Sequence, residues 1–145
     1  MTVASICQRT VDTVRPTETV LTAAQRMASR CVGTLVVVGH DEHPIGILTD
    51  RDLALRVVAA GADAQATTVA DVMSGEVAVI SDDASIEAAI GAMRTHNVRR
   101  LPVVDADRRL VGIVSLEDVL GLLAREMADV GAFVQQTAPS KLATS

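Results

Sequence analysis

The sequence predicts a mixed α/β fold made of two similar halves. The segment Gly-Ile-Leu-Thr-Asp-Arg-Asp at 46–52 returns as Gly-Ile-Val-Ser-Leu-Glu-Asp at 112–118, which is 66 residues later (112 minus 46). Within each half, runs of β-branched residues alternate with stretches whose apolar residues recur at helical spacing. A long repeat without gaps indicates duplication of one supersecondary unit.

The two halves keep one register over most of the chain. Identical residues recur at the same separation in the pairs Met27 and Met93, Val32 and Val98, Leu35 and Leu101, Val37 and Val103, and Asp41 and Asp107. Clefts form preferentially where two such units meet. We therefore expect functional residues at matched positions of the two halves.

Each half is expected to begin with a short helical turn and a short strand. These lie at 3–8 and 11–14 in the first half and at 69–73 and 77–80 in the second. Thr19 and Ser85 follow at matched positions, and hydroxyl side chains of this kind favour the N-cap of a helix. Behind each cap, apolar residues recur every three or four positions, which predicts a helix with one buried face.

Two strands and a closing helix are expected to complete each half. Runs of β-branched and other apolar residues predict strands at 34–38, 45–48, 101–104 and 110–114. A helix then begins at Thr49 in the first half and at Ser115 in the second. The second closing helix carries more apolar residues than one packing face needs, so a partner helix is expected.

The order of elements in each half is therefore strand, helix, strand, strand, helix. We assign the first repeat to 3–62, a linker to 63–68, the second repeat to 69–128 and a flexible tail to 129–145. Interleaved strands and helices of this kind pack as an α/β sandwich.

Composition excludes several classes of function. The net charge is −5, whereas general nucleic-acid binding needs a basic surface. Phe133 is the only aromatic residue, so the stacking platforms of single-strand binders are absent. Cys7 and Cys31 form no C-x-x-C pair, and the longest apolar runs are far too short to cross a bilayer. We expect a cytoplasmic protein that binds neither nucleic acid nor membrane.

The chemistry is expected at Thr49-x-x-Asp52 and its copy Ser115-x-x-Asp118. A hydroxyl followed three residues later by an acid resembles a capping box, although Glu or Gln is the commoner partner. The same geometry suits a ligand, because a helix N-terminus attracts phosphate and a carboxylate accepts hydrogen bonds from ribose hydroxyls. Both interpretations remain open, since one carboxylate has about four lone-pair sites.

Two glycines move the balance toward a ligand site. Gly46 and Gly112 lie inside predicted strands, where glycine weakens pairing and often marks close approach by a ligand or another backbone. The duplication of glycine, hydroxyl and aspartate together is more than capping requires.

The pattern Gly-Ile-Leu-Thr-x-x-Asp, together with Arg-Arg-Leu-Pro-Val-Val-Asp at 99–105, resembles the CBS domain, named after cystathionine β-synthase. The resemblance covers residues 3–128. It implies tandem β-α-β-β-α repeats with pseudo-two-fold symmetry that form one CBS-pair module. In ligand-binding members, clefts between the repeats take AMP, ADP, ATP or S-adenosylmethionine. The resemblance further implies that Asp52 and Asp118 hold riboses, and that Thr49 and Ser115 face phosphate or ribose oxygens.

The two copies differ in charge. Arg99 and Arg100 stand where the first half has Gly33 and Thr34, and the resemblance implies that basic residues there meet phosphates. The alternative is a solvated basic edge paired with nearby aspartates. Arg51 lies inside the first motif, where the second motif has Glu117, an acid that should repel a phosphate. We therefore expect unequal sites, with the cleft around Asp52 favoured for a phosphorylated ligand.

Adenine recognition would have to be aliphatic, because aromatic side chains are nearly absent. The resemblance implies that five residues lie on strands that line the clefts: Val11, Val14, Val77, Val79 and Ile80. Of these, we expect Val14 and Ile80 to contact the ligand. The alternative, which is the commoner one for such residues, is a core position.

The resulting expectation is a regulatory sensor that binds adenosyl ligands, rather than an enzyme, and that forms a homodimer through its apolar helices. The alternative is a stand-alone interaction or stress protein with an unidentified protein partner and no nucleotide ligand. A metal-dependent hydrolase is less favoured. The segment His-Asp-Glu-His at 40–43 could hold a metal but is typical of a solvated turn, so we assign no metal ligands and no catalytic residues.

Overall fold

A computed structural model describes residues 1–139 of the chain. The first half contains η1 (Val3–Ser5), β1 (Thr13–Val14), α1 (Val20–Arg30), β2 (Thr34–Val38), η2 (His40–Glu42), β3 (Pro44–Thr49), α2 (Asp50–Leu53) and the π-helical turn η3 (Ala54–Val58). The second half contains α3 (Val69–Val72), β4 (Ile80–Ser81), α4 (Ile86–His96), β5 (Arg100–Val104), β6 (Leu110–Ser115) and α5 (Leu116–Thr137). The mixed α/β fold predicted from the duplication is confirmed.

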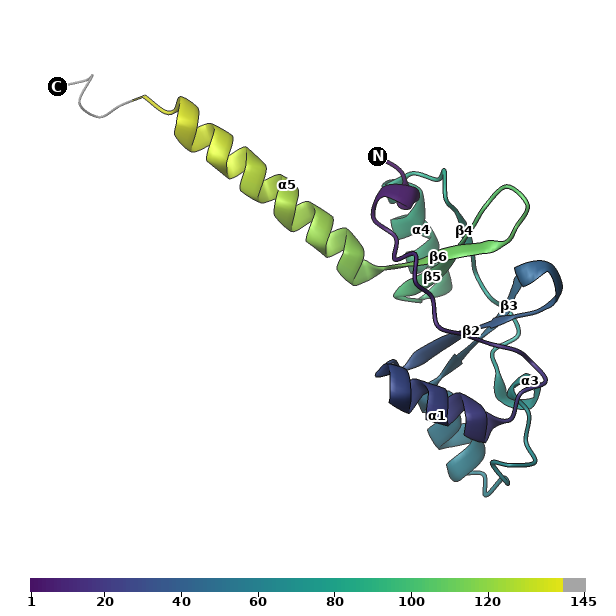
Figure 1. Cartoon of the computed structure of the whole chain (residues 1–145). Helices are drawn as coiled ribbons and strands as arrows, with labels where there is room; N and C mark the ends of the chain where they lie inside the picture. The colour runs from purple at the N-terminus through teal and green to yellow at the C-terminus, as the bar shows by residue number, and fades with distance from the viewer. Residues whose placement is uncertain (140–145) are drawn as a thin grey trace.

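Each half holds one three-stranded sheet. The strand orders are β1-β2-β3 and β4-β5-β6, and in each sheet the first pair is parallel and the second antiparallel. Figure 1 shows the two sheets side by side, with α1 and α4 on their outer sides. The β-branched runs form buried strands, because four of the five residues of both β2 and β5 are buried.

The predicted helix caps are present at matched positions. The Thr19 Oγ1 accepts a hydrogen bond from the Thr22 N–H at 3.2 Å, and the Ser85 Oγ accepts one from the Ala88 N–H at 3.0 Å. Both helices end on a left-handed residue, Cys31 in α1 and Asn97 in α4. These ends direct the chain into β2 and β5, at whose starts the candidate site lies.

The halves exchange their first short helices. Val3 of η1 is fully buried in the core of the second sheet, whereas Val69 and Val72 of α3 are buried in the core of the first. The chain that follows each helix pairs with the same sheet, Gln8 with Ile113 and Ser74 with Ile47. The two packing units therefore do not coincide with the repeats at 3–62 and 69–128.

The last helix is longer than the sequence analysis allows. The tail expected at 129–145 begins inside α5, which continues to Thr137. Gly131 and the small residues around it suggested a frayed segment, yet the alanines among them are strong helix formers. In Figure 1, α5 leaves the body beside β6 and projects away from it. Residues 140–145 of the expected tail lie outside the described residues.

Candidate functional site

Two related clefts lie between the halves. The larger, which we call the Asp52 cleft, has a volume of about 670 Å³, within the range typical of small-molecule sites. It is lined by Thr34, Ile47, Thr49, Arg51, Asp52, Ser74, Glu76, Val77, Ala78, Asn97, Val98, Arg99, Arg100 and Pro102. The start of α2 thus lies opposite the first residues of β5. The cleft therefore brings the Thr49-x-x-Asp52 motif together with Arg99 and Arg100.

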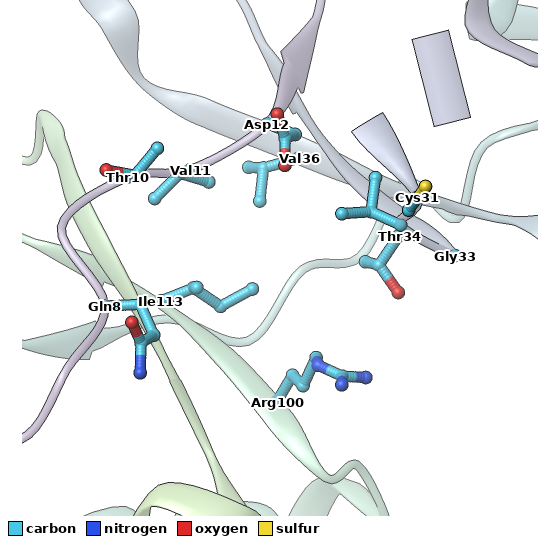
Figure 2. Close-up of a pocket in the computed structure, with 11 residues that line it drawn as sticks. Gln8, Thr10, Val11, Asp12, Cys31, Gly33, Thr34, Val36, Arg100 and Ile113 are labelled. Atoms are coloured by element: carbon cyan, nitrogen blue, oxygen red, sulfur yellow. The ribbon is translucent and has the colours of Figure 1, made fainter. Parts of the chain in front are cut away.

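The smaller cleft, which we call the Gln8 cleft, has a volume of about 320 Å³. Figure 2 shows Gln8, Ile113 and Arg100 facing Asp12, Val36 and Thr34 across it. Every residue that lines it has a partner 66 positions away that lines the Asp52 cleft, for example Gln8 and Ser74 (74 minus 8). The two clefts are therefore copies of one site, and Thr34 and Arg100 line both.

Asp52 closes a capping box and keeps one oxygen available. Its Oδ2 accepts the Thr49 N–H at 2.9 Å, and its own N–H donates to the Thr49 Oγ1 at 3.1 Å. Among residues 1–139, the Asp52 Oδ1 forms one ion pair, with the Arg56 Nε at 4.0 Å. The capping interpretation is thus confirmed, and it leaves Oδ1 able to accept a ribose hydroxyl.

Asp118 forms the same capping box with Ser115, but both of its carboxylate oxygens accept hydrogen bonds within the chain. Its Oδ2 accepts the Ser115 N–H at 2.9 Å, and its Oδ1 accepts the Gln8 Nε2 at 3.1 Å. Ser115, Glu117 and Asp118 do not line the Gln8 cleft, although their first-half partners line the Asp52 cleft. The Gln8 side chain therefore occupies the position at which a ligand would meet Asp118.

Three arginines converge on the Asp52 cleft. Among residues 1–139, the Arg51 and Arg100 guanidinium groups make no hydrogen bond or ion pair. The Arg99 Nη2 donates to the Glu117 Oε1 at 2.6 Å, in the first turn of α5. The backbone N–H of Glu117 and the Arg99 guanidinium hold the pKa of the Glu117 carboxyl below its usual value. The alternative pairing of Arg99 and Arg100 with Asp105 or Asp107 is not present.

The charges make the two clefts unequal. The Asp52 cleft combines three arginines with Asp52 and Glu76, whereas the Gln8 cleft has Arg100 and Asp12 as its charged side chains. Asp12 is itself paired with the Arg30 Nε at 2.8 Å. The Asp52 cleft is therefore the more favourable environment for an anion.

The glycines inside the strands allow a second backbone segment to approach closely. A Cβ at Gly46 would lie 2.8 Å from the Ser74 carbonyl oxygen, and a Cβ at Gly112 would lie 2.8 Å from that of Gln8. Both positions admit the strand-like segment that crosses from the other half. Of the two causes that the sequence left open, close approach of another backbone is the one observed.

Val14 and Ile80 are not cleft residues. Val14 is 1% exposed within the core of the first sheet, and Ile80 packs against the core of the second. Neither residue lines the Asp52 cleft or the Gln8 cleft: the Val14 side chain is in the core, and Ile80 is partly buried beside the second core. Val11 and Val77, which lie on the same predicted strands, do line the Gln8 cleft and the Asp52 cleft respectively.

Several lining residues escaped the sequence analysis. Gln8, Ser74 and Glu76 reach the clefts on the exchanged segments, which local patterns do not reveal. The 66-residue period is the signal that could have found them, because Gln8 matches Ser74. Arg56 follows Asp52 by one helical turn, a spacing at which ion pairs are common.

Within residues 1–139, no three His, Cys, Asp or Glu side chains gather closely enough to hold a metal ion. In the same part of the chain, the helices are too short or too polar to cross a bilayer.

Comparisons with known proteins agree with the duplicated architecture. The family model of the CBS domain matches twice, at 3–59 and at 69–125. The CBS domain-containing protein YhcV of Bacillus subtilis is 45% identical over 109 residues, which are 75% of this chain and 76% of that protein. Hypoxic response protein 1 of Mycobacterium tuberculosis is 37% identical over 102 residues, 70% of this chain and 71% of the relative. The chain spans 61% of the length of an uncharacterized protein of Methanopyrus kandleri that is 36% identical.

Solved structures share the fold. Hypoxic Response Protein I, crystallised with two coordinated zinc ions, superposes with a TM-score of 0.75 at 35% identity, over 83% of this chain and 97% of that chain. The CBS domain pair of protein MJ0100, in complex with 5′-methylthioadenosine and S-adenosyl-L-methionine, gives 0.75 at 25% identity, over 87% and 98%. Two family matches on two structurally equivalent halves lead to one conclusion: the chain belongs to the CBS-domain family, as a tandem pair.

Proposed function

We propose that this CBS pair is a cytoplasmic regulatory module that senses an adenosyl ligand (AMP, ADP, ATP or S-adenosylmethionine) in its Asp52 cleft, and that it is not an enzyme. The proposal is carried by one observation in a single cleft of about 670 Å³. There the Asp52 Oδ1, which accepts no hydrogen bond within residues 1–139 and lies 4.0 Å from the Arg56 Nε, meets the Arg51 and Arg100 guanidinium groups. Ribose needs such an acceptor, and phosphate needs such donors.

The arginines make phosphorylated ligands the favoured class. Arg51 lies in the first turn of α2 and lines the Asp52 cleft, so its guanidinium can donate to an anionic group there. Hydrogen bonds to a charged group each contribute about 1.5–3 kcal/mol, so two guanidinium contacts would separate AMP clearly from adenosine. The apolar residues Ile47, Val77 and Val98 supply the surface on which adenine would lie.

Unequal occupancy is part of the proposal. The Gln8 side chain competes with a ribose for the Asp118 carboxylate, and the smaller cleft offers one arginine. Binding of a first ligand in the Asp52 cleft should therefore be much tighter than any binding in the Gln8 cleft. The structure of the MJ0100 pair, a neighbour at 25% identity, holds 5′-methylthioadenosine and S-adenosyl-L-methionine, which supports an adenosyl ligand as the class.

Regulation requires more than binding. A ligand shifts a conformational equilibrium only by its difference in affinity for the two states. We propose that the responding state is a homodimer, as the apolar helices led us to expect.

The alternative is an interaction protein that keeps the fold and binds no nucleotide. Two observations favour it. The capping box gives Asp52 a structural role without a ligand, and the close approach of a backbone carbonyl does the same for Gly46.

Isothermal titration calorimetry distinguishes the two functions. We expect AMP to bind one site per chain and to bind at least about tenfold more tightly than adenosine, the energy of one charged hydrogen bond. Parallel titrations with ADP, ATP and S-adenosylmethionine rank the ligand class. If none of the five compounds gives heat at millimolar concentration, the interaction protein is the correct function.

A further inference from the structure

Arg56 is the basic neighbour of Asp52, and it lines neither the Asp52 cleft nor the Gln8 cleft. Its Nε lies 4.0 Å from the Asp52 Oδ1, one helical turn further along the chain, where α2 passes into η3. This distance is longer than a hydrogen bond, so Oδ1 keeps its capacity to accept a hydroxyl group. Arg56 therefore attracts the carboxylate without taking the place of a ligand.

The tip of the Arg56 side chain is anchored to the other half of the protein. Its Nη1 donates to the Val72 carbonyl oxygen at 2.7 Å. Val72 is the last residue of α3, where helical carbonyl groups lack a partner within the helix, and it is buried in the core of the first sheet. A side chain anchored in this way loses little further rotamer freedom on pairing, which is the main cost of an exposed ion pair. Arg56 is therefore a fixed support for its neighbour.

This support completes the orientation of the Asp52 carboxylate. The capping box fixes Oδ2, which accepts the Thr49 N–H at 2.9 Å. The terminal torsion of an aspartate is broad, so one hydrogen bond alone allows the carboxylate to rotate. The guanidinium of Arg56 beside Oδ1 restrains that rotation, and Oδ1 is the oxygen that a ribose hydroxyl would use.

The second half holds its matching carboxylate in a different way. Leu122 stands where the first half has Arg56 (122 minus 56 is 66), and an aliphatic side chain cannot pair with an acid. Asp118 is held instead by the Gln8 Nε2 at 3.1 Å, and Gln8 lines the smaller cleft. The first half thus supports its carboxylate from outside the cleft, whereas the second half supports it from the side on which a ligand would lie.

We propose that Arg56 is a positioning residue for ribose recognition, which acts through Asp52 and not by contact with the ligand. The inference rests on the proposed function and names the residue that makes this carboxylate ready to bind. A group that is already oriented binds without the entropic cost of ordering it. Because the Val72 anchor belongs to the exchanged helix α3, the junction of the two halves also determines how well Asp52 binds.

Calorimetric titration of the full chain with two nucleotides tests the inference. AMP carries the ribose hydroxyls that Asp52 would bind, and 2′,3′-dideoxy-AMP carries the same base and phosphate without them. We expect the wild type to prefer AMP by about tenfold or more, the effect of one charged hydrogen bond. In Arg56→Met this preference should fall by roughly threefold to fivefold, the upper part of the range for one ion pair, through weaker binding of AMP alone. The fold should survive, because the Arg56 side chain is 51% exposed.

Arg15→Met is the matched control. Arg15 also lies in the first half, where it donates to the Gly39 carbonyl oxygen at 2.7 Å and pairs with the Glu42 carboxylate. It lines neither cleft, so the same loss of charge should leave the preference for AMP unchanged. A second control combines Arg56→Met with Asp52→Ala. If Arg56 acts through Asp52, the double variant should show the same preference as Asp52→Ala alone.

The two nucleotides separate this inference from the proposed function. An Arg56→Met variant that keeps the wild-type preference, including one that binds both nucleotides more weakly by the same factor, overturns the positioning role while AMP binding stands. A wild type that binds both nucleotides equally well overturns the ribose contact of Asp52 and the role of Arg56 together. A wild type that binds neither nucleotide overturns the proposed function, and this inference with it.

Discussion

Asp52 and Asp118 occupy matched positions, and each closes a capping box with the hydroxyl residue three positions earlier. What distinguishes them is the second oxygen. In Asp118 it accepts the Gln8 amide at 3.1 Å, whereas in Asp52 it remains available to the cleft. The carboxylate can thus be structural in both halves and ligand-binding in one.

Asp52→Ala should separate these roles. We expect AMP affinity to fall about tenfold or more through loss of a charged hydrogen bond, and the free energy of unfolding to fall by about 1 kcal/mol through loss of the cap. Calorimetric titration and chemical denaturation measure the two effects. Asp118→Ala is the control, with a similar loss of stability and little change in AMP affinity. Unchanged AMP affinity in Asp52→Ala would leave Asp52 with the capping role alone.

The sequence predicted those cleft residues that lie within short contiguous motifs. Thr49, Asp52 and the pair Arg99–Arg100 could be identified because the motif and its copy are contiguous and share one period. Val14 and Ile80 line neither cleft, because which side of a short strand faces the core depends on packing from distant segments. Gln8 was missed for the same reason.

At the scale of the elements, the crossing segments depend on glycine. Gly46→Ala should lower the free energy of unfolding by about 1–3 kcal/mol, the usual cost of overpacking, because its Cβ would lie 2.7 Å from the Met73 Sδ and 2.8 Å from a backbone carbonyl. Gly91→Ala in α4 is the control, since nothing lies within 4 Å of its Cβ and alanine favours the helix. Thermal unfolding of both variants checks the contrast, and equal melting temperatures would contradict it.

The ion pair between Arg99 and Glu117 connects the Asp52 cleft to the first turn of α5. While Glu117 holds Arg99, that guanidinium is less able to bind a phosphate. Glu117→Gln should therefore raise AMP affinity by roughly fivefold, the equivalent of about 1 kcal/mol for one hydrogen bond.

Glu126→Gln provides the matched control for this prediction, because it makes the same charge change further along α5, away from the cleft. Titration of both variants with AMP in low salt measures the difference. A gain of the same size in both would mean that overall charge, rather than release of Arg99, sets the affinity.

Element boundaries were predicted where they are set locally. The caps at Thr19 and Ser85 were found because a hydroxyl before an apolar helical pattern acts within one turn. The end of α5 was predicted too early, at residue 128 rather than Thr137. Gly131 and its small neighbours lack the apolar pattern by which a helix packed on the body would be recognised. The exchange of η1 and α3 leaves no local trace at all.

At the scale of the whole molecule, that exchange ties the two halves together. Val3→Ala should lower stability by about 2 kcal/mol, because it removes two methyl groups from a fully buried position in the core of the second sheet. Although residue 3 lies at the start of the first repeat, we expect one cooperative transition for the wild type and the variant, with equal calorimetric and van't Hoff enthalpies. Two separate transitions would show that the halves unfold independently.

Arg100 lines both clefts from the start of β5. One guanidinium shared by two openings cannot donate fully to two anions at once, and the first phosphate to engage it would leave the other opening poorer in positive charge. In the proposed sensor, antagonism between the openings would then be built into the junction itself, and the module would report a ratio of competing metabolites rather than the amount of one.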